Sequence, residues 1–193
     1  MTLLKSLRSN ESNLAESARG SGVTSSDYSE PGARDFLLIA EDNLADVRLL
    51  RLALEEYGIP IGVHVVRDGE AVLRFIERVE EDPLARCAAL AIVDLNLPRY
   101  GGDEILRRLR ASEKWRHVPV IVASSSVAAS DRAEAMRLGA AAYFVKPSDL
   151  EQFLRIGALI RDILSKRVSN AAHAVALHVH LPITQPVFEE QTN

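Results

Sequence analysis

The sequence of 193 residues contains only one cysteine, Cys87, and no apolar run that approaches the roughly 20 residues of a membrane-spanning helix. A single thiol cannot form an internal disulfide bond, so we interpret Cys87 as a half-buried packing residue. Residues 1–8 also lack the apolar central stretch of a secretion signal. Together these absences predict a cytoplasmic protein with no membrane partner.

The chain also has no excess of positively charged residues. The chain has 23 lysine and arginine residues against 27 aspartate and glutamate residues, which gives a net charge of −4. Binding to DNA or RNA needs clustered positive charge, so we expect no nucleic-acid partner. The sequence also has no glycine-rich phosphate loop of the P-loop or dinucleotide-binding type, which disfavours a flavin-binding fold.

Residues 1–33 are rich in Ser, Gly, Asn and Glu and show no helical or strand periodicity. Such a segment cannot bury enough apolar surface to offset its ordering entropy, so we predict a disordered N-terminal arm.

From Phe36 onward, short apolar runs alternate with longer amphipathic segments. Nearly continuous apolar runs are typical of strands that are buried on both faces. The predicted strands are residues 36–40, 61–66, 88–93, 118–123 and 142–145.

A segment with apolar residues at helical spacing follows each predicted strand. Asn43 and Ser148 suit helix starts because an acidic residue stands three positions after each, and Gly139 suits a helix end. Five strand–helix units predict an α/β fold of the flavodoxin-like (βα)5 type, a doubly wound parallel sheet in one domain over residues 35–166. The helical stripes are Leu44, Val47, Leu50, Leu54 and Tyr57; Val72, Phe75, Ile76 and Val79; Ile105, Leu106 and Leu109; Ala133, Met136 and Leu138; and Leu150, Phe153, Leu154 and Ile160.

Polar side chains suited to phosphoryl or metal chemistry follow four of the five predicted strands. They are Glu41 with Asp42, Asp94, Ser124 and Lys146. Because ligands of such folds bind at the carboxyl ends of the strands, we expect these residues to converge at one edge of the sheet. Scattered surface charge would not select strand ends in this way.

The types of these side chains indicate a phosphorylation site. Carboxylates placed close together repel one another unless a cation offsets them, and an all-oxygen cluster suits Mg²⁺. A carboxylate can also attack phosphorus and form an aspartyl phosphate. Lys146 and Ser124 supply an ammonium and a hydroxyl group, which can neutralise and position the transferred group.

Four motifs resemble the receiver domain of two-component response regulators over residues 35–166. In order along the chain they are FLLIAEDN, VDLNLPRYGGDEIL, VPVIVASSS and GAAAYFVKPSDLEQF. Each motif is weak by itself, but the four in this order and spacing form a specific pattern. The resemblance implies that Asp94 is the phosphoacceptor, and that Glu41, Asp42, Asp94 and the backbone carbonyl of Asn96 bind Mg²⁺.

The resemblance also assigns roles to the later motifs. Ser124 would form a hydrogen bond with the phosphoryl group, Lys146 would pair with it, and Tyr143 would be the aromatic switch that changes rotamer with Ser124. The Lys146–Pro147 peptide bond is expected to be cis, which only a bond before proline makes inexpensive. Glu41 and Ser124 replace the commoner Asp and Thr, but both keep the required oxygen atoms.

Two other readings of this site remain. One is a receiver-like scaffold that acts without phosphorylation, which the complete set of acidic residues and Lys146 disfavours. The other is a phosphohydrolase that passes through an aspartyl phosphate, but such enzymes expect a second Asp where this chain has Asn96. We therefore predict a phosphoaccepting signalling protein and not an enzyme.

Residues 167–193 follow the last predicted helix and contain Pro182 and Pro186. We expect an extended or disordered C-terminal segment here, with no room for a helix-turn-helix domain. His178 and His180 could face one side of a short strand, yet they have no nearby partner that would favour a metal site. The predicted output is therefore a protein interaction controlled by phosphorylation.

The expected partners are a sensor histidine kinase or phosphotransfer protein as donor, an output protein, and a second copy of this chain. Within the family, the sequences EDNLADVRLLRLAL, DLNLP and KPSDLEQF are most similar to the stand-alone regulators of phytochrome-type and hybrid sensor kinases.

Overall fold

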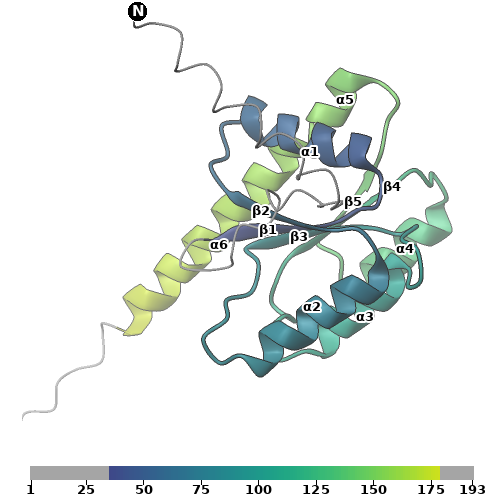
Figure 1. Cartoon of the computed structure of the whole chain (residues 1–193). Helices are drawn as coiled ribbons and strands as arrows, with labels where there is room; N and C mark the ends of the chain where they lie inside the picture. The colour runs from purple at the N-terminus through teal and green to yellow at the C-terminus, as the bar shows by residue number, and fades with distance from the viewer. Residues whose placement is uncertain (1–34, 179–193) are drawn as a thin grey trace, which may run out of the picture.

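A computed structural model describes residues 35–178 and contains one five-stranded sheet. The strand order is β2-β1-β3-β4-β5, and every neighbouring pair is parallel (Figure 1). This arrangement confirms the predicted doubly wound sheet. The strands are β1 (Phe36–Ala40), β2 (Gly62–Val66), β3 (Leu90–Asp94), β4 (Val120–Ser124) and β5 (Ala142–Val145).

Helices cover both faces of the sheet (Figure 1). On one face lie α1 (Leu44–Glu56), α5 (Leu150–Leu154) and α6 (Ile156–His178). On the other lie α2 (Gly69–Glu81), α3 (Gly102–Ala111) and α4 (Ala129–Arg137). Two helices replace the single last helix that we predicted, because the chain makes a turn at Arg155.

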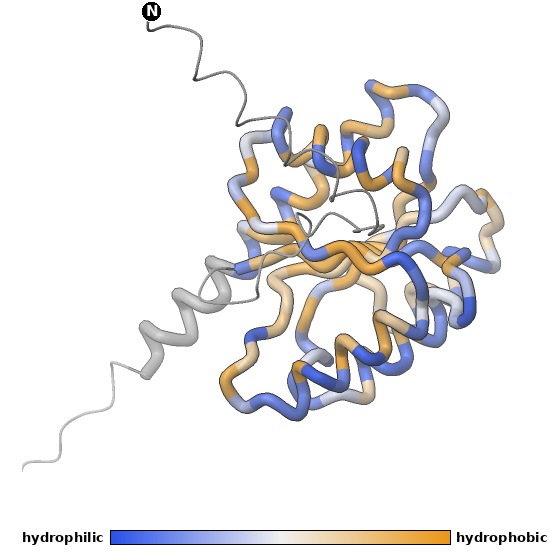
Figure 2. The backbone as a smooth tube through the Cα atoms, in the orientation of Figure 1, coloured by the Kyte–Doolittle hydropathy of each residue, from blue (hydrophilic) through white to orange (hydrophobic). Residues whose placement is uncertain are grey.

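The central strands separate two apolar cores. Successive side chains of a strand point to opposite faces, so Leu37 and Ile39 of β1 pack toward α1 and α6, whereas Leu38 packs toward α2 and α3. All residues of β1, β3 and β4 are buried. Figure 2 shows these strands as hydrophobic and the outer sides of the helices as hydrophilic. The buried strands place their carboxyl ends at one edge with little freedom to shift.

Two of the predicted helix boundaries are confirmed and one is wrong. The Asn43 side chain accepts a hydrogen bond from the backbone N–H of Ala45 at 2.9 Å and caps α1. Gly139 follows α4 with φ of +90°, a conformation that favours glycine. The start of α5 is capped by Asp149 instead of Ser148, because the Asp149 carboxylate reaches the N–H of Gln152 at 2.9 Å.

Two helical segments differ from the prediction. In α4 the buried residue is Ala135, whereas Ala133 and Met136 of the predicted stripe are exposed, and Leu138, just after the helix, packs against the core. The C-terminal helix α6 continues to His178, so the expectation of an extended or disordered segment is wrong for residues 167–178. Four of the residues 169–178 are alanine, the strongest helix former.

Some predictions fall on residues outside the described range. They concern the N-terminal arm of residues 1–33 and the chain after His178, including His180, Pro182 and Pro186. Within residues 35–178, none of the helices has the length and apolar character needed to cross a membrane.

Candidate functional site

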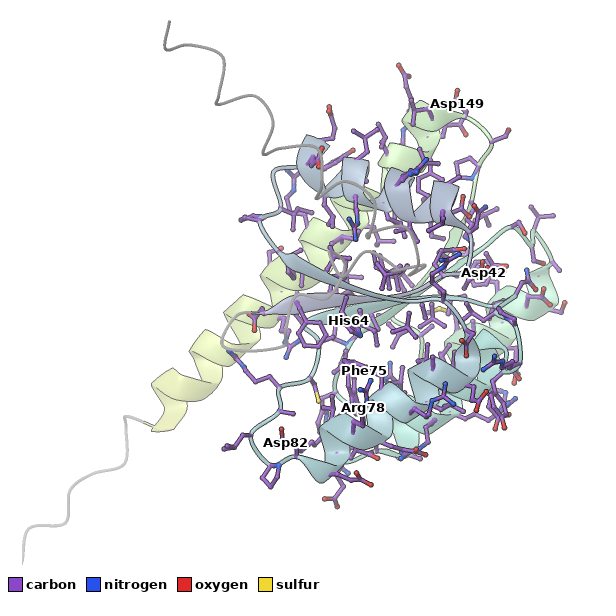
Figure 3. The ribbon with its side chains drawn as sticks, viewed as in Figure 1. Asp42, His64, Phe75, Arg78, Asp82 and Asp149 are labelled. Carbon is purple, nitrogen blue, oxygen red and sulfur yellow. The ribbon has the colours of Figure 1, made fainter. Side chains whose placement is uncertain are left out.

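The predicted residues come together at the carboxyl edge of the sheet. Glu41 and Asp42 follow β1, Asp94 and Ser124 are the last residues of β3 and β4, and Lys146 follows β5. Figure 3 shows Asp42 at this edge of the sheet, close to the start of α1. The parallel register of the strands thus gathers residues that are up to 105 positions apart in the sequence.

Lys146 is the centre of the polar network. Its Nζ atom lies 2.6 Å from Glu41 Oε2, 2.6 Å from Asp94 Oδ2 and 2.9 Å from Asp46 Oδ2. Its side chain is only 9% exposed. Burial alone would lower the pKa of this ammonium, but hydrogen bonds to the three carboxylates outweigh burial and raise the pKa above its usual value. Lys146 is therefore a fixed positive charge.

Three carboxylates lie close enough to share one cation. Oxygen atoms of Glu41, Asp42 and Asp94 all lie within 4.8 Å of one another. Glu41 and Asp94 are buried and Asp42 is exposed, so the cluster opens to solvent on one side. Burial raises the pKa of Glu41 to about 7, and the neighbouring Asp94 adds to this rise while Lys146 opposes it. These carboxylates suit a hard divalent cation, which would offset their repulsion.

Asp94 is held in place by its own loop and by α3. The backbone N–H of Asn96 donates to Asp94 Oδ1 at 2.9 Å, while Oδ2 accepts from Lys146. Gly102 begins α3 directly behind this residue, since an added Cβ atom would lie 2.4 Å from the carbonyl oxygen of Asp94. The missing side chain at Gly102 lets α3 begin directly against the backbone at the end of β3.

A second group of residues links the site to α4. The Ser124 hydroxyl oxygen accepts from the backbone N–H of Ser126 at 3.1 Å. The Ser126 hydroxyl donates to Asp131 at 2.6 Å, and the Tyr143 hydroxyl donates to the carbonyl oxygen of Ser126 at 3.0 Å. The loop between β4 and α4 is therefore tied to the site residue Ser124 and to Tyr143.

The Lys146–Pro147 bond is trans, so the prediction of a cis bond is wrong. Trans is the more stable isomer of a bond before proline. The backbone N–H of Lys146 donates to the carbonyl oxygen of Ser124 at 2.8 Å, and the Lys146 side chain reaches its carboxylate partners in this isomer.

Sequence reasoning missed the role of Asp46 at this site. We interpreted Asp46 as part of a helix-start pattern with Asn43, but its carboxylate accepts from Lys146. The N–H of Asn43 donates instead to Glu41 Oε1 at 3.2 Å. The position of Asp46 in the sequence could have indicated this contact, because Asp46 lies in the first turn of the helix that follows Glu41 and Asp42.

A family model for the response regulator receiver domain matches residues 37–157, more than half of the chain. The chain belongs to this receiver family. It is a signalling protein and not a classical enzyme. The probable methanogenesis regulatory protein FilR2 of Methanothrix harundinacea is 31% identical over 134 residues, which cover 69% of this chain and 86% of FilR2.

Solved receiver structures share both the sequence pattern and the fold. The phosphorylated cyanobacterial phytochrome response regulator RcpA is 30% identical with a TM-score of 0.61, over 68% of this chain and 94% of RcpA. Response regulator Rcp1 is a protein of Synechocystis. Its Mn²⁺-bound form is 27% identical with a TM-score of 0.58, over 64% of this chain and 88% of Rcp1. The predicted flavodoxin-like receiver fold is thus confirmed.

Proposed function

We propose that this receiver accepts a phosphoryl group on Asp94 from the phosphohistidine of a sensor kinase or phosphotransfer protein. The observation that carries the proposal is the position of the Asp94 carboxylate. The Asp94 residue is 6% exposed, and its carboxylate lies within the group of three carboxylates and accepts a hydrogen bond from Lys146. A buried strand-end aspartate with this charge environment has the chemistry of a nucleophile toward phosphorus.

One bond forms and one bond breaks in the transfer. A carboxylate oxygen of Asp94 forms a bond to phosphorus, the bond between phosphorus and the donor imidazole nitrogen breaks, and that nitrogen keeps the electron pair. The added negative charge comes to lie beside Lys146, whose raised pKa keeps it protonated. Ser124 offers a hydroxyl group from the end of the neighbouring strand. Both groups can stabilise the charge of the phosphoryl oxygens.

Mg²⁺ is the cation that we propose for the three carboxylates, with the backbone carbonyl of Asn96 as a further ligand. The all-oxygen donor set suits this ion, and the Mn²⁺-bound form of Rcp1 supports a divalent cation in a related receiver. When bound, Mg²⁺ would neutralise the carboxylates and the incoming phosphoryl oxygens. Glu41 must lose its proton to act as a ligand, which its raised pKa makes dependent on pH.

The output that we propose is a change in protein interactions, carried from Ser124 through the loop to Tyr143 and α4. The hydrogen bonds of Ser126 to Asp131 and to Tyr143 support this route, since a phosphoryl group that recruits the Ser124 hydroxyl would disturb them. A sensor kinase of the phytochrome type is the proposed donor, supported by the similarity to RcpA. A homodimer and an output protein are the other proposed partners, in the cytoplasm.

Incubation with acetyl phosphate and Mg²⁺, followed by intact-mass measurement, tests this proposal. The wild-type protein should gain the mass of one phosphoryl group, and excess EDTA should prevent the gain. Asp94→Asn should gain none. Asp103→Asn is the matched control, because Asp103 is an exposed carboxylate that pairs with Arg107 outside the site. An unmodified wild-type protein, or a gain that persists in Asp94→Asn, would overturn the proposal.

A further inference from the structure

Asp46 differs from the other carboxylates that contact Lys146. Its Oδ2 atom lies 2.9 Å from Lys146 Nζ, and the two residues are 100 positions apart in the sequence. The side chains are 18% and 9% exposed, so solvent screens this pair only weakly. Within the described residues, however, Asp46 is not part of the carboxylate group that could hold a metal ion.

The other two partners of Lys146 belong to that group. Glu41 and Asp94 each offer an oxygen to the ammonium and also line the candidate cation site. An ammonium has three N–H donors and no acceptor, and here each donor has one carboxylate. A cation and a phosphoryl group that draw on Glu41 and Asp94 therefore compete with Lys146 for its acceptors. Asp46 is free of that competition.

The helix α1 fixes the position of Asp46. The next residue, Val47, is buried, as is Leu50 one turn later, and both pack into the core against the sheet. Asn43 caps the same helix immediately before the turn that contains Asp46. The carboxylate is therefore presented from a rigid element, and little entropy is lost when it holds the lysine side chain.

We propose that Asp46 is a positioning residue that holds the Lys146 ammonium at the site while a cation and a phosphoryl group occupy Glu41 and Asp94. This inference rests on the proposed function. A buried ammonium that lost all its partners at once would be strongly destabilised. With Asp46 present, Lys146 keeps one acceptor, so the cation displaces it from Glu41 at a lower cost and the ammonium stays beside the incoming phosphoryl group.

Two simpler roles make different predictions. A stabilising role at the first turn of α1 would change the free energy of unfolding without changing cation binding. A direct attraction between the Asp46 charge and the cation would weaken binding in Asp46→Asn whether or not Lys146 is present. A role through Lys146 requires that the effect of Asp46→Asn disappears when the lysine is removed.

A double-mutant cycle read out by calorimetric titration with MgCl₂ separates these roles. The proteins are wild type, Asp46→Asn, Lys146→Met and the double variant, each checked for folding by urea unfolding. Asp46→Asn should raise the Kd for Mg²⁺ roughly fivefold to tenfold, a size of coupling expected for contacting residues. In the Lys146→Met background the same change should alter the Kd by less than about twofold.

The rate of phosphorylation by acetyl phosphate at saturating Mg²⁺ supplies the second readout. Asp46→Asn should slow modification of Asp94 by about tenfold, as expected when a charge is mispositioned in phosphoryl transfer, and Asp46→Glu should restore part of the rate. Glu70→Gln removes a first-turn carboxylate from α2 instead and should leave the Kd and the rate unchanged. The Glu70 carboxylate is exposed and pairs with Arg74 and Arg99.

The outcomes distinguish the inference from the function on which it rests. An equal rise in Kd in both backgrounds would overturn the positioning role and assign a direct charge effect. An Asp46→Asn protein with unchanged Kd and unchanged rate would overturn it as well. A wild-type protein that neither binds Mg²⁺ nor becomes phosphorylated would instead overturn the proposed function.

Discussion

At the carboxyl end of the sheet, Glu41 and Asp94 are 1% and 6% exposed and have ionisable carboxyl groups, whereas beneath the sheet Phe75 and Trp115 are 4% and 0% exposed and have no ionisable group. Figure 3 shows Phe75 and His64 together on the α2 side, where their rings stack at 4.4 Å between centroids. The ring of Trp115 meets that of Phe75 edge-on at 6.0 Å. Two regions of the molecule are therefore buried to a similar degree but contain chemically different side chains.

The difference lies in what burial does to each region. Removing apolar rings from water stabilises the fold, and edge-to-face contacts add to this stabilisation. Removing carboxylates from water disfavours their charged form, as the raised pKa of Glu41 shows. The apolar core thus stabilises the fold. Burial of the carboxylates at the carboxyl end does not stabilise it, and these groups keep their positions because the apolar core holds the strands that carry them.

Removal of the largest buried ring should give the largest loss of stability. We expect Trp115→Ala to lower the free energy of unfolding by about 3–5 kcal/mol, because it leaves a cavity in a well-packed core. Leu84→Ala is the control, since this side chain is 90% exposed and its loss should change stability by less than about 0.5 kcal/mol. Urea unfolding measures both. Equal losses of unfolding free energy in the two variants would contradict the assignment of Trp115 to the core and of Leu84 to the surface.

The charged end should gain stability from a cation, which the apolar core cannot do. At a Mg²⁺ concentration a hundred times the Kd, the free energy of unfolding should rise by about 2.7 kcal/mol relative to EDTA. Asp94→Asn removes one carboxylate of the group, so its gain should be much smaller. Thermal unfolding in the two buffers measures the difference. A wild-type protein with the same Tm in both buffers would contradict the assignment of a cation site.

The effect with the smallest expected change per step of the experiment is a dependence of stability on pH that belongs to Glu41. Its pKa is about 7 in the folded protein and its ordinary value is 4.5, so the folded state takes up a proton that the unfolded chain does not bind in this window. In EDTA, the stabilisation from this proton is fully present below about pH 4.5 and is lost as the pH rises through about 7.

Glu41→Gln should remove this contribution. The difference in free energy of unfolding between wild type and variant should then change by at most about 1.4 kcal/mol per pH unit within the window. Comparing the two proteins at each pH cancels other groups, such as His64, whose pKa is lowered by burial. Parallel pH profiles for the two proteins would show that Glu41 titrates as an ordinary surface carboxylate.

Sequence reasoning succeeded where one physical rule decides the outcome. The apolar runs located all five strands, because the central strands β1, β3 and β4 are fully buried and the edge strands β2 and β5 are also mostly apolar. The topology then brought Glu41, Asp94 and Lys146 to one edge, as expected for parallel strands. The residues predicted to converge therefore do lie together in the folded molecule.

The predictions that failed depended on weaker local signals. The stripe assigned to α4 overlooked Ala135, the buried residue of that helix, since alanine gives little hydrophobic contrast. The length of α6 was missed because its last residues, 169–178, are rich in alanine, which favours a helix but gives little contrast between apolar and polar positions. Asp46 was missed because a first-turn carboxylate looks the same in the sequence whether it only favours the helix start or binds a lysine that is distant along the chain.

Chemical trapping of the acyl phosphate tests the central claim most directly. After reaction with acetyl phosphate and Mg²⁺, borohydride reduces an aspartyl phosphate to homoserine, and peptide mass spectrometry then locates the converted residue. We predict conversion at Asp94 alone, lost in Asp94→Asn and in the presence of EDTA. Conversion at another carboxylate, or no conversion in a protein that has gained the phosphoryl mass, would contradict the assignment of Asp94 as the phosphoacceptor.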